Sequence, residues 1–210
     1  MKDHPELYKY ENELLESGIK LIAGCDEAGR GPLAGRVYAA SVILNPDDKI
    51  VGLYDSKKHT EKERDYLFDE IKKRSLSYAI TYLEAEEIDE INILEASRKC
   101  MEMAISRLSI KPEHIITDYM DLYKTNIPYT KLAHGDMLSA TVAAASILAK
   151  VERDRYMDEM DKLYPEYGFS LNKGYPTKKH LEALEKYGTT PIHRKSYGPV
   201  KKMLQLKLDI

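Results

Sequence analysis

Cysteine is scarce in this sequence, because Cys25 and Cys100 are the only two among 210 residues. Two cysteines cannot build a disulfide framework, and no second pair stands at the spacing of a zinc finger. The six histidines contain no HxxxH pair. These absences exclude a metal centre of thiolates or paired imidazoles, so any catalytic metal must be a hard ion held by carboxylates.

Long apolar runs are lacking as well. The longest uncharged stretch, residues 137–149, spans 13 residues and contains Ser and Thr, whereas a membrane span needs about 20 predominantly apolar residues. The opening MKDHP is polar and has no apolar core, so it is not a secretory signal. With so few cysteines, the economical expectation is a soluble, cytoplasmic protein.

No internal repeat, low-complexity tract or Gly/Ser linker divides the chain. Hydrophobic residues make up 43% of the sequence and charged residues 32%, which suits a sizeable core under a charged surface. We therefore expect residues 1–210 to form one catalytic domain, in which about 160–210 is a small basic subregion.

The net charge of -3 is unevenly distributed. Residues 171–210 contain nine Lys/Arg against three Asp/Glu, a local charge of +6, so the remainder carries -9. A basic end beside an acidic body fits a protein that grips phosphates with one part and metals with another. A merely solvated basic face is the alternative interpretation.

Hydrophobic patterning predicts strands that alternate with helices. Residues 36–44 are almost continuously apolar, which is typical of a strand buried on both faces, and Thr60 with Glu63 forms a capping-box pattern that opens a helix. We expect strands at 21–26, 36–44, 77–83 and 114–118, and helices at 4–16, 60–74, 94–108, 138–163 and 177–187. This order indicates a mixed α/β fold with a central sheet.

Four acids stand out by their positions. Asp26 and Glu27 end the first predicted strand before a glycine-rich turn, Asp118 ends another strand, and Asp136 precedes a helix rich in small residues. Strand ends and helix starts are where open α/β sheets bind ligands. Taken singly, each acid could instead be a turn residue, and Asp136 could be a helix N-cap.

Brought together, these carboxylates would repel one another unless a cation neutralised them. Hard oxygen ligands select Mg²⁺ or Mn²⁺. Two such ions, about 3.5–4 Å apart, are the usual device for cleaving a phosphodiester, since one activates water and the other stabilises the leaving oxygen.

The sequence also contains six longer motifs. They are GCDEAGRGPLAG at 24–35, DSKK at 55–58, AAASILAKV at 143–151 followed by RDR at 153–155, YGF at 167–169, KGYPT at 173–177 and HRKSYGPV at 193–200. In this order they resemble ribonuclease HII, over roughly residues 21–202. The sister type, ribonuclease HIII, normally has a different turn sequence and an additional N-terminal domain, whereas about twenty residues precede the first strand here.

The resemblance implies an RNase H-like fold, with a five-stranded mixed sheet flanked by helices and a helical C-terminal extension. It implies that Asp26, Glu27, Asp118 and Asp136 are the catalytic, metal-binding acids, with Mn²⁺ or Mg²⁺ as cofactor. The implied substrate is an RNA/DNA hybrid, or duplex DNA with embedded ribonucleotides, cut 5′ to the ribonucleotide to leave 3′-hydroxyl and 5′-phosphate ends. The implied role is ribonucleotide removal in DNA replication and repair, by a monomer with no obligate protein partner.

Further residues are expected to bind the substrate. Only the 2′-hydroxyl separates ribose from deoxyribose, and by resemblance the Gly29-Arg30-Gly31 turn reads it, with the Arg30 side chain free to hold a phosphate. Tyr175 would pack against the deoxyribose on the DNA side of the junction, although without its motif it reads as an ordinary core tyrosine. Basic side chains expected to contact duplex phosphates are Lys57, Lys58, Arg194 and Lys195.

Three positions depart from the family's usual pattern: Arg36 replaces a proline, Tyr119 a glycine and His134 a lysine. Tyr119 matters most, because it follows the presumed ligand Asp118. Two rival functions remain at this point, a DNA nuclease or resolvase of the same superfold and a non-catalytic hybrid-binding protein. The Gly29-Arg30-Gly31 turn with Tyr175 disfavours the first, and the presence of all four acids disfavours the second.

Overall fold

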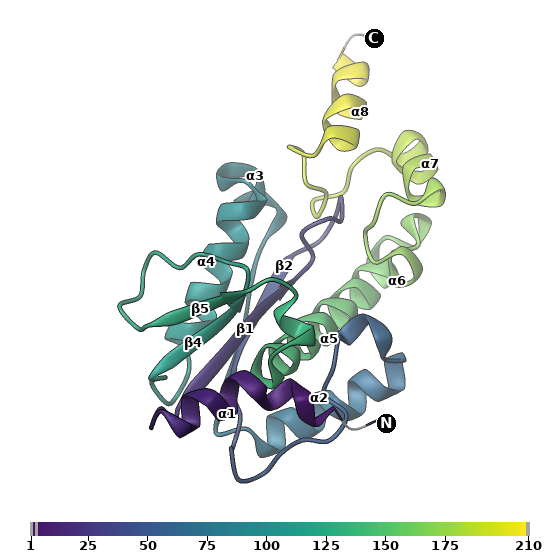
Figure 1. Cartoon of the computed structure of the whole chain (residues 1–210). Coiled ribbons are helices and arrows are strands. Elements are labelled where there is room, and N and C mark those ends of the chain that lie inside the picture. Colours follow the sequence, from purple (N-terminus) through teal and green to yellow (C-terminus); the bar gives the residue numbers. More distant parts are fainter. Residues whose placement is uncertain (1, 3, 209–210) are drawn as a thin grey trace.

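A five-stranded mixed sheet lies at the centre of the computed structural model, which describes residue 2 and residues 4–208 (Figure 1). The strands are β1 (Ile22–Ala28), β2 (Val37–Ile43), β3 (Ser77–Leu83), β4 (His114–Asp118) and β5 (Tyr129–Leu132). Their order is β3-β2-β1-β4-β5, in which β1, β2 and β3 are antiparallel neighbours and β4 and β5 continue parallel to β1. The predicted fold class is confirmed.

Helices surround this sheet and extend beyond it. In the described residues the α-helices are α1 (Lys9–Glu16), α2 (Glu61–Arg74), α3 (Ala85–Ile91), α4 (Ile93–Ser106), α5 (Ala140–Leu163), α6 (Phe169–Asn172), α7 (Lys178–Tyr187) and α8 (Gly198–Leu208). Short 3-10 helices are η1 (Pro5–Tyr8), η2 (Ser56–Lys58), η3 (Gly135–Met137) and η4 (Pro165–Tyr167).

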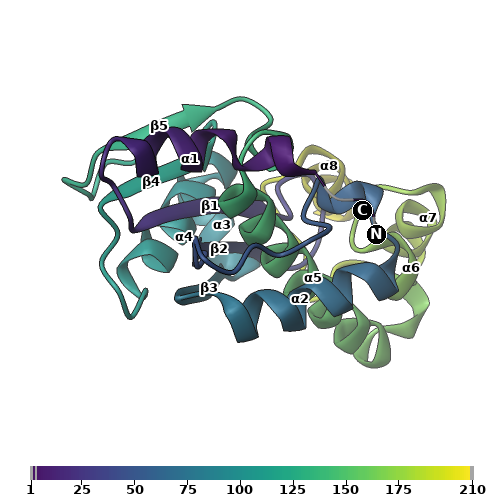
Figure 2. The same ribbon diagram turned by 60° about the horizontal axis from the view of Figure 1, so that its bottom comes forward.

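Strand β2 is buried along its whole length, as its continuous apolar sequence predicts. Tyr38, Ala40 and Val42 face a core shared with α2 and α5. Val37, Ala39 and Ile43 face the opposite core, which α4 covers. The sheet is therefore the middle of three layers, with α2 and α5 on one side and α3 and α4 on the other (Figures 1 and 2).

Helix α5 lies unusually close to the sheet. A Cβ placed on Gly24 of β1 would stand 2.1 Å from the carbonyl carbon of Thr141 and 2.3 Å from the backbone nitrogen of Val142. Only glycine at position 24, together with the small side chains at 143–146 of α5, allows this approach. The result is that α5 brings its polar side chains directly over the carboxyl edge of β1.

The chain beyond α5 is helical, as the resemblance implies. Helices α6, α7 and α8 extend away from the sheet at the far end of α5, and α8 projects from the body (Figure 1). Across the described residues, none of the helices is both long and apolar enough to cross a lipid bilayer.

Candidate active site

Two of the four acids meet because their strands are parallel neighbours. Strands β1 and β4 pair with Cys25 opposite Thr117, so the next residue on each strand, Asp26 and Asp118, lie side by side at the carboxyl edge of the sheet. Both line a pocket of about 300 Å³. This edge is where open α/β sheets bind ligands.

Asp26 is the most deeply placed acid of this pocket, with 5% of its surface exposed. Its Oδ1 accepts a hydrogen bond from the backbone N–H of Glu27 at 2.7 Å, and Ser146 of α5 also hydrogen-bonds to it. Burial, and then the negative charges of Glu27 and Asp118, raise the pKa of Asp26 well above its ordinary value of 3.8. The folded protein thus holds this carboxyl in surroundings that disfavour its negative charge.

Glu27 reaches the pocket from the next position of β1. Its Oε1 accepts a hydrogen bond from Arg30 at 3.3 Å, whereas Oε2 is buried without a hydrogen-bond partner. Burial raises the pKa of Glu27, Arg30 partly offsets that effect, and Asp118 adds repulsion. A buried carboxylate oxygen without a partner is costly unless something positive meets it.

Asp136 does not line this pocket, but a backbone contact brings it next to Asp118. The N–H of Gly135 donates to Oδ1 of Asp118 at 2.9 Å, which seats η3 against the end of β4. The alternative interpretation, that Asp136 caps the following helix, is wrong, because Ser139 is the N-cap of α5 and accepts from Val142. Instead Asp136 lies 3.6 Å from the ammonium of Lys57, and burial raises the pKa of its carboxyl.

Lys57 carries a positive charge beside Asp136. It follows Asp55, whose side chain caps η2 by accepting from the Lys57 N–H at 2.9 Å. Burial opposes the charge on its ammonium, yet Asp136, Asp55 and Asp26 attract it, and the pKa of Lys57 is raised overall. Lys57 and Arg30 cannot neutralise four carboxylates, since Lys150 of this pocket pairs with Asp154 and Arg153 binds backbone carbonyls.

The donor set therefore fits divalent cations. Carboxylate oxygens are the ligands that Mg²⁺ and Mn²⁺ prefer, the unpartnered Oε2 of Glu27 is available, and the pKa values of Asp26, Glu27 and Asp136 are all raised by burial. Within the described residues, no three Asp, Glu, His or Cys side chains are already arranged as a metal cage. Asp26, Glu27 and Asp118 instead line an open pocket, and Asp136 lies next to it beside Lys57.

The turn of Gly29, Arg30 and Gly31, hereafter the 29–31 turn, lines the same pocket. Gly29 has a φ of +102°, and a Cβ there would stand 2.2 Å from Nε of Arg153. A Cβ on Gly31 would stand 3.2 Å from the ring of Tyr175. Glycine is thus required at 29 by both conformation and space, and Gly31 places the Tyr175 ring directly against the turn.

Tyr175 lines the pocket with 49% of its surface exposed, so it is not a core tyrosine. Lys57 and Arg30 also line this pocket. Lys58 and Lys195 do not: the ammonium of Lys58 lies 4.8 Å from the centre of the Tyr54 ring, and Lys195 lies beside the acids of α3, where its N–H donates to Asp89 at 2.7 Å.

The expectation that Arg194 grips a duplex is wrong, because its surface is 0% exposed. Its guanidinium donates to five backbone carbonyls of one loop, at distances of 2.7–3.2 Å; these belong to Gly29, Arg30, Pro32, Gly35 and Arg36. The planar fork of an arginine suits such a task. Arg194 therefore shapes the 29–31 turn from behind.

Sequence reasoning missed several residues of the pocket, namely Ser56, Ser146, Lys150 and Arg153. Arg153 is buried and donates to the carbonyls of Ala34, Arg36 and Lys173, so it supports the same loop as Arg194. Ser146, Lys150 and Arg153 lie in the motifs at 143–155, but the surrounding run of small and apolar residues gave no reason to single them out. Their spacing on one helix face was the available signal.

The three departures from the family pattern have visible local structures. Arg36 pairs with Glu84 and lies over the rings of Tyr82 and Tyr156, at 3.9 and 4.4 Å from their centres. Tyr119 and His134 both adopt positive φ, of 50° and 60°, a region that favours glycine. Even so, the N–H of Tyr119 donates to Leu132 of β5 at 3.1 Å, so the chain after Asp118 keeps its sheet contact.

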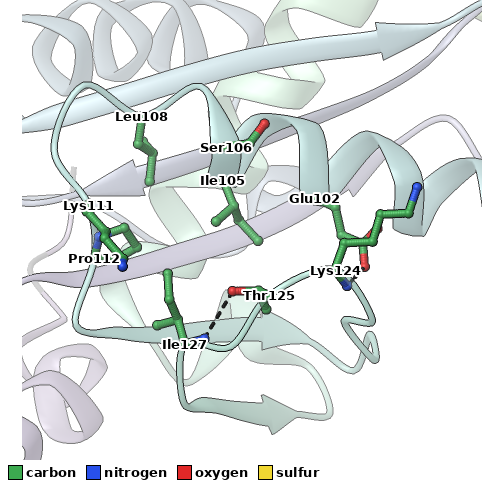
Figure 3. Close-up of a pocket in the computed structure, with 9 residues that line it drawn as sticks. All are labelled: Glu102, Ile105, Ser106, Leu108, Lys111, Pro112, Lys124, Thr125 and Ile127. Carbon is green, nitrogen blue, oxygen red and sulfur yellow. Dashed lines mark hydrogen bonds between the residues drawn. The ribbon is translucent and has the colours of Figure 1, made fainter.

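A second pocket, of about 230 Å³, lies at the C-terminal end of α4 (Figure 3). Its single acid, Glu102, already accepts from the backbone N–H groups of Tyr123 and Lys124 at 2.6 and 2.9 Å. Ile105, Leu108 and Ile127 make much of the remaining wall. It lacks the converging carboxylates of the first pocket, which is therefore the candidate active site.

Comparison with known proteins shows the family of this chain. The family model described as ribonuclease HII matches residues 23–200. Ribonuclease HII of Acholeplasma laidlawii is 51% identical over 196 residues, which are 93% of this chain and 96% of that protein.

Solved structures show the same fold. Ribonuclease H2 from Pyrococcus horikoshii OT3 is 28% identical, with a TM-score of 0.80 over 90% of this chain and 99% of that one. RNase HII of Archaeoglobus fulgidus, solved in complex with PCNA, is 27% identical, with a TM-score of 0.74 over 85% and 95% of the two chains. The chain thus belongs to the ribonuclease HII family and is a ribonuclease H, an endonuclease that acts on the RNA of RNA/DNA hybrids.

Proposed function

We propose that this enzyme also cuts duplex DNA at embedded ribonucleotides, on the 5′ side of the ribonucleotide, and leaves 3′-hydroxyl and 5′-phosphate ends. The observation that carries the proposal is a single pocket whose one wall is acidic and whose other wall is a glycine turn packed on an exposed tyrosine. Such a pocket is suited both to cleaving a phosphodiester and to distinguishing ribose from deoxyribose. Removal of ribonucleotides during DNA replication and repair would follow from this activity.

The acidic wall would hold two divalent ions, Mn²⁺ or Mg²⁺, through Asp26, Glu27, Asp118 and Asp136. When bound, such ions supply Lewis-acid activation of water and stabilise the leaving oxygen. The chain's own groups prepare that site: Ser146 orients the Asp26 carboxylate, and Oδ1 of Asp118 fixes Gly135 and hence the position of Asp136. Lys57 balances part of the negative charge beside Asp136.

The opposite wall would distinguish the sugars. Because Gly29 and Gly31 lack side chains, the backbone of the 29–31 turn can approach a 2′-hydroxyl, which both donates and accepts hydrogen bonds. The ring of Tyr175, packed on Gly31, would lie against the following deoxyribose, where a 2′-hydroxyl would clash with it. Arg30, whose side chain is 46% exposed, would hold a phosphate.

Cleavage of three duplexes tests this proposal: all-DNA, DNA with one ribonucleotide, and a long RNA/DNA hybrid, each with Mg²⁺ and with Mn²⁺. We expect cutting of the second and third but not the first, and extension of the products by a DNA polymerase would report the 3′-hydroxyl. Cutting of all-DNA duplex would favour the nuclease or resolvase reading, and binding without cutting would favour a non-catalytic protein.

Variants assign the chemistry to the pocket. Asp26→Asn and Asp118→Asn should each abolish turnover while the fold and hybrid binding persist. Asp121→Asn is the matched control, because Asp121 follows the same strand but pairs with Lys131 outside the pocket. Full activity in Asp26→Asn or Asp118→Asn would remove that residue from the catalytic machinery.

A further inference from the structure

Tyr175 is held by its backbone rather than by its ring. Its carbonyl accepts two hydrogen bonds, from the N–H of Thr177 at 2.8 Å and from Nδ1 of His180 at 2.9 Å. Its ring is half exposed in the pocket. The direction of the ring therefore depends on the contacts that fix this carbonyl.

A chain of hydrogen bonds determines the tautomer of both histidines behind Tyr175. The backbone N–H of Thr190 can only donate, so Nδ1 of His193, at 2.9 Å, accepts, and the proton of the neutral His193 ring lies on Nε2. That Nε2 faces Nε2 of His180 at 3.1 Å and donates to it. His180 then carries its proton on Nδ1 and donates to Tyr175.

The surroundings keep both rings uncharged. His180 and His193 are buried and pack against Tyr167 and Phe169. Burial lowers the pKa of both rings, that of His193 to about 4. A proton added to Nε2 of His180 would face the N–H of His193, and one added to Nδ1 of His193 would face the N–H of Thr190, so one arrangement of protons satisfies every group.

The same segment also holds the other wall of the pocket. His193 forms an isolated β-bridge with Ala34, and its neighbour Arg194 binds the carbonyls of Gly29 and Arg30. Tyr175 and the 29–31 turn are therefore anchored to one short stretch of chain, through His180–His193 in the first case and through Arg194 in the second.

We propose that the His180–His193 pair is a positioning device, which fixes the ring of Tyr175 relative to the 29–31 turn. The turn and the ring can then contact two adjacent sugars of the substrate at the same time. The inference rests on the proposed function, in which the turn reads the ribose and Tyr175 the deoxyribose that follows. His180 and His193 touch no reacting atom in this role. Their contribution is to specificity for the sugar after the ribonucleotide.

The tautomers are tested in the wild-type protein by two-dimensional ¹H–¹⁵N NMR correlation of the imidazole rings at neutral pH. We expect a protonated Nδ1 and a bare Nε2 in His180, and the reverse in His193. A proton on Nε2 of His180, or a charged ring in the pair, would overturn the proposal. This measurement requires no variant and decides the matter even where a substitution prevents folding.

The functional consequence is tested with two duplexes that differ in one sugar. Both contain a ribonucleotide, followed on its 3′ side by a deoxynucleotide in one duplex and by a second ribonucleotide in the other. The readout is kcat/KM for cutting on the 5′ side of the first ribonucleotide. The value for the duplex with the deoxynucleotide is divided by the value for the duplex with the second ribonucleotide. His180→Phe keeps an aromatic ring but loses the donor to Tyr175, and it should lower the ratio by about tenfold or more, since a displacement of ~1 Å can cost about a hundredfold.

Two further variants separate positioning from general stability. His180→Asn keeps an amide donor near the Nδ1 position and should restore most of the ratio. Tyr167→Phe removes a buried hydrogen bond of 2.7 Å, to the carbonyl of Gly188, from the same aromatic cluster, and should leave the ratio unchanged. An unchanged ratio in His180→Phe, or an equal loss in Tyr167→Phe, would refute the proposal. Failure of the wild type to cut either duplex would instead refute the proposed function.

Discussion

Replacing Gly24 by Ala should damage both the fold and the active site. The added Cβ would stand 2.1 Å from a backbone atom of Thr141, and ordinary contact begins at 3.4 Å, so α5 and β1 must separate by about 1.3 Å. Both elements are buried, and overpacking a core typically costs about 1–3 kcal/mol. Because two backbones collide here, we expect about 3 kcal/mol or more.

The same displacement of α5 should also lower the catalytic rate. Helix α5 carries Ser146, which hydrogen-bonds to Asp26, and follows directly from η3 with Asp136. A shift of ~1 Å at a catalytic group can cost about a hundredfold in rate, so kcat on a hybrid should fall by about that factor. Urea unfolding and single-turnover cleavage measure the two effects.

Gly198→Ala is the matched control, because a Cβ there meets no atom within 4 Å. It should be as stable as the wild type or slightly more so, since Ala is the better helix former. If Gly24→Ala matched the wild type in stability and rate, the close approach of α5 to β1 would not be what sets the site.

Further predictions concern charge and the loop. In metal-free protein Asp26→Asn should raise the free energy of unfolding by about 0.5–2 kcal/mol at neutral pH. Below pH 3.8 the Asp26 carboxyl is protonated in both states, so the penalty that its raised pKa signals grows as pH rises above 3.8 and levels off once pH exceeds the folded pKa. Unfolding in EDTA at several pH values measures it, and a constant gain at all pH values would contradict this reasoning. Arg194→Lys cannot hold five carbonyls and should cost about 3 kcal/mol in thermal or urea unfolding. Lys195→Ala should stay within about 0.5 kcal/mol, and an equal loss in both would show that the buried contacts of Arg194 are unimportant.

Elements with strong local signals were predictable from the sequence. The Thr60–Glu63 capping box is present and opens α2, and the apolar strands at 77–83 and 114–118 end where predicted. In these segments the local pattern and the tertiary packing favour the same structure.

Other elements were missed because their local sequence is weak. Strand β5 reads Tyr-Thr-Lys-Leu and has one buried residue, so no apolar run marks it. It exists because β4 offers it an edge to pair with. Helix α3 is mostly acidic and short, and Glu84 with Glu87 supplies its capping box in place of the usual Ser or Thr.

The candidate site was only partly predictable from the sequence. The motifs indicate which residues matter, but they do not show which side chains are buried. The parallel pairing of β1 with β4, and the contact from Gly135 to Asp118, bring the acids together through pairs far apart in the chain. Arg194 shows the opposite case: its motif predicts importance and its charge suggests phosphate, yet five carbonyls of a distant loop enclose it. Charge alone does not distinguish a ligand-binding arginine from a structural one.

Anomalous diffraction from crystals soaked in Mn²⁺ would show whether the four acids bind metal ions. We expect manganese peaks between the carboxylates of Asp26, Glu27, Asp118 and Asp136, beside the 29–31 turn, and their loss in Asp118→Asn. Manganese bound only elsewhere on the protein, with these four carboxylates unengaged, would contradict it.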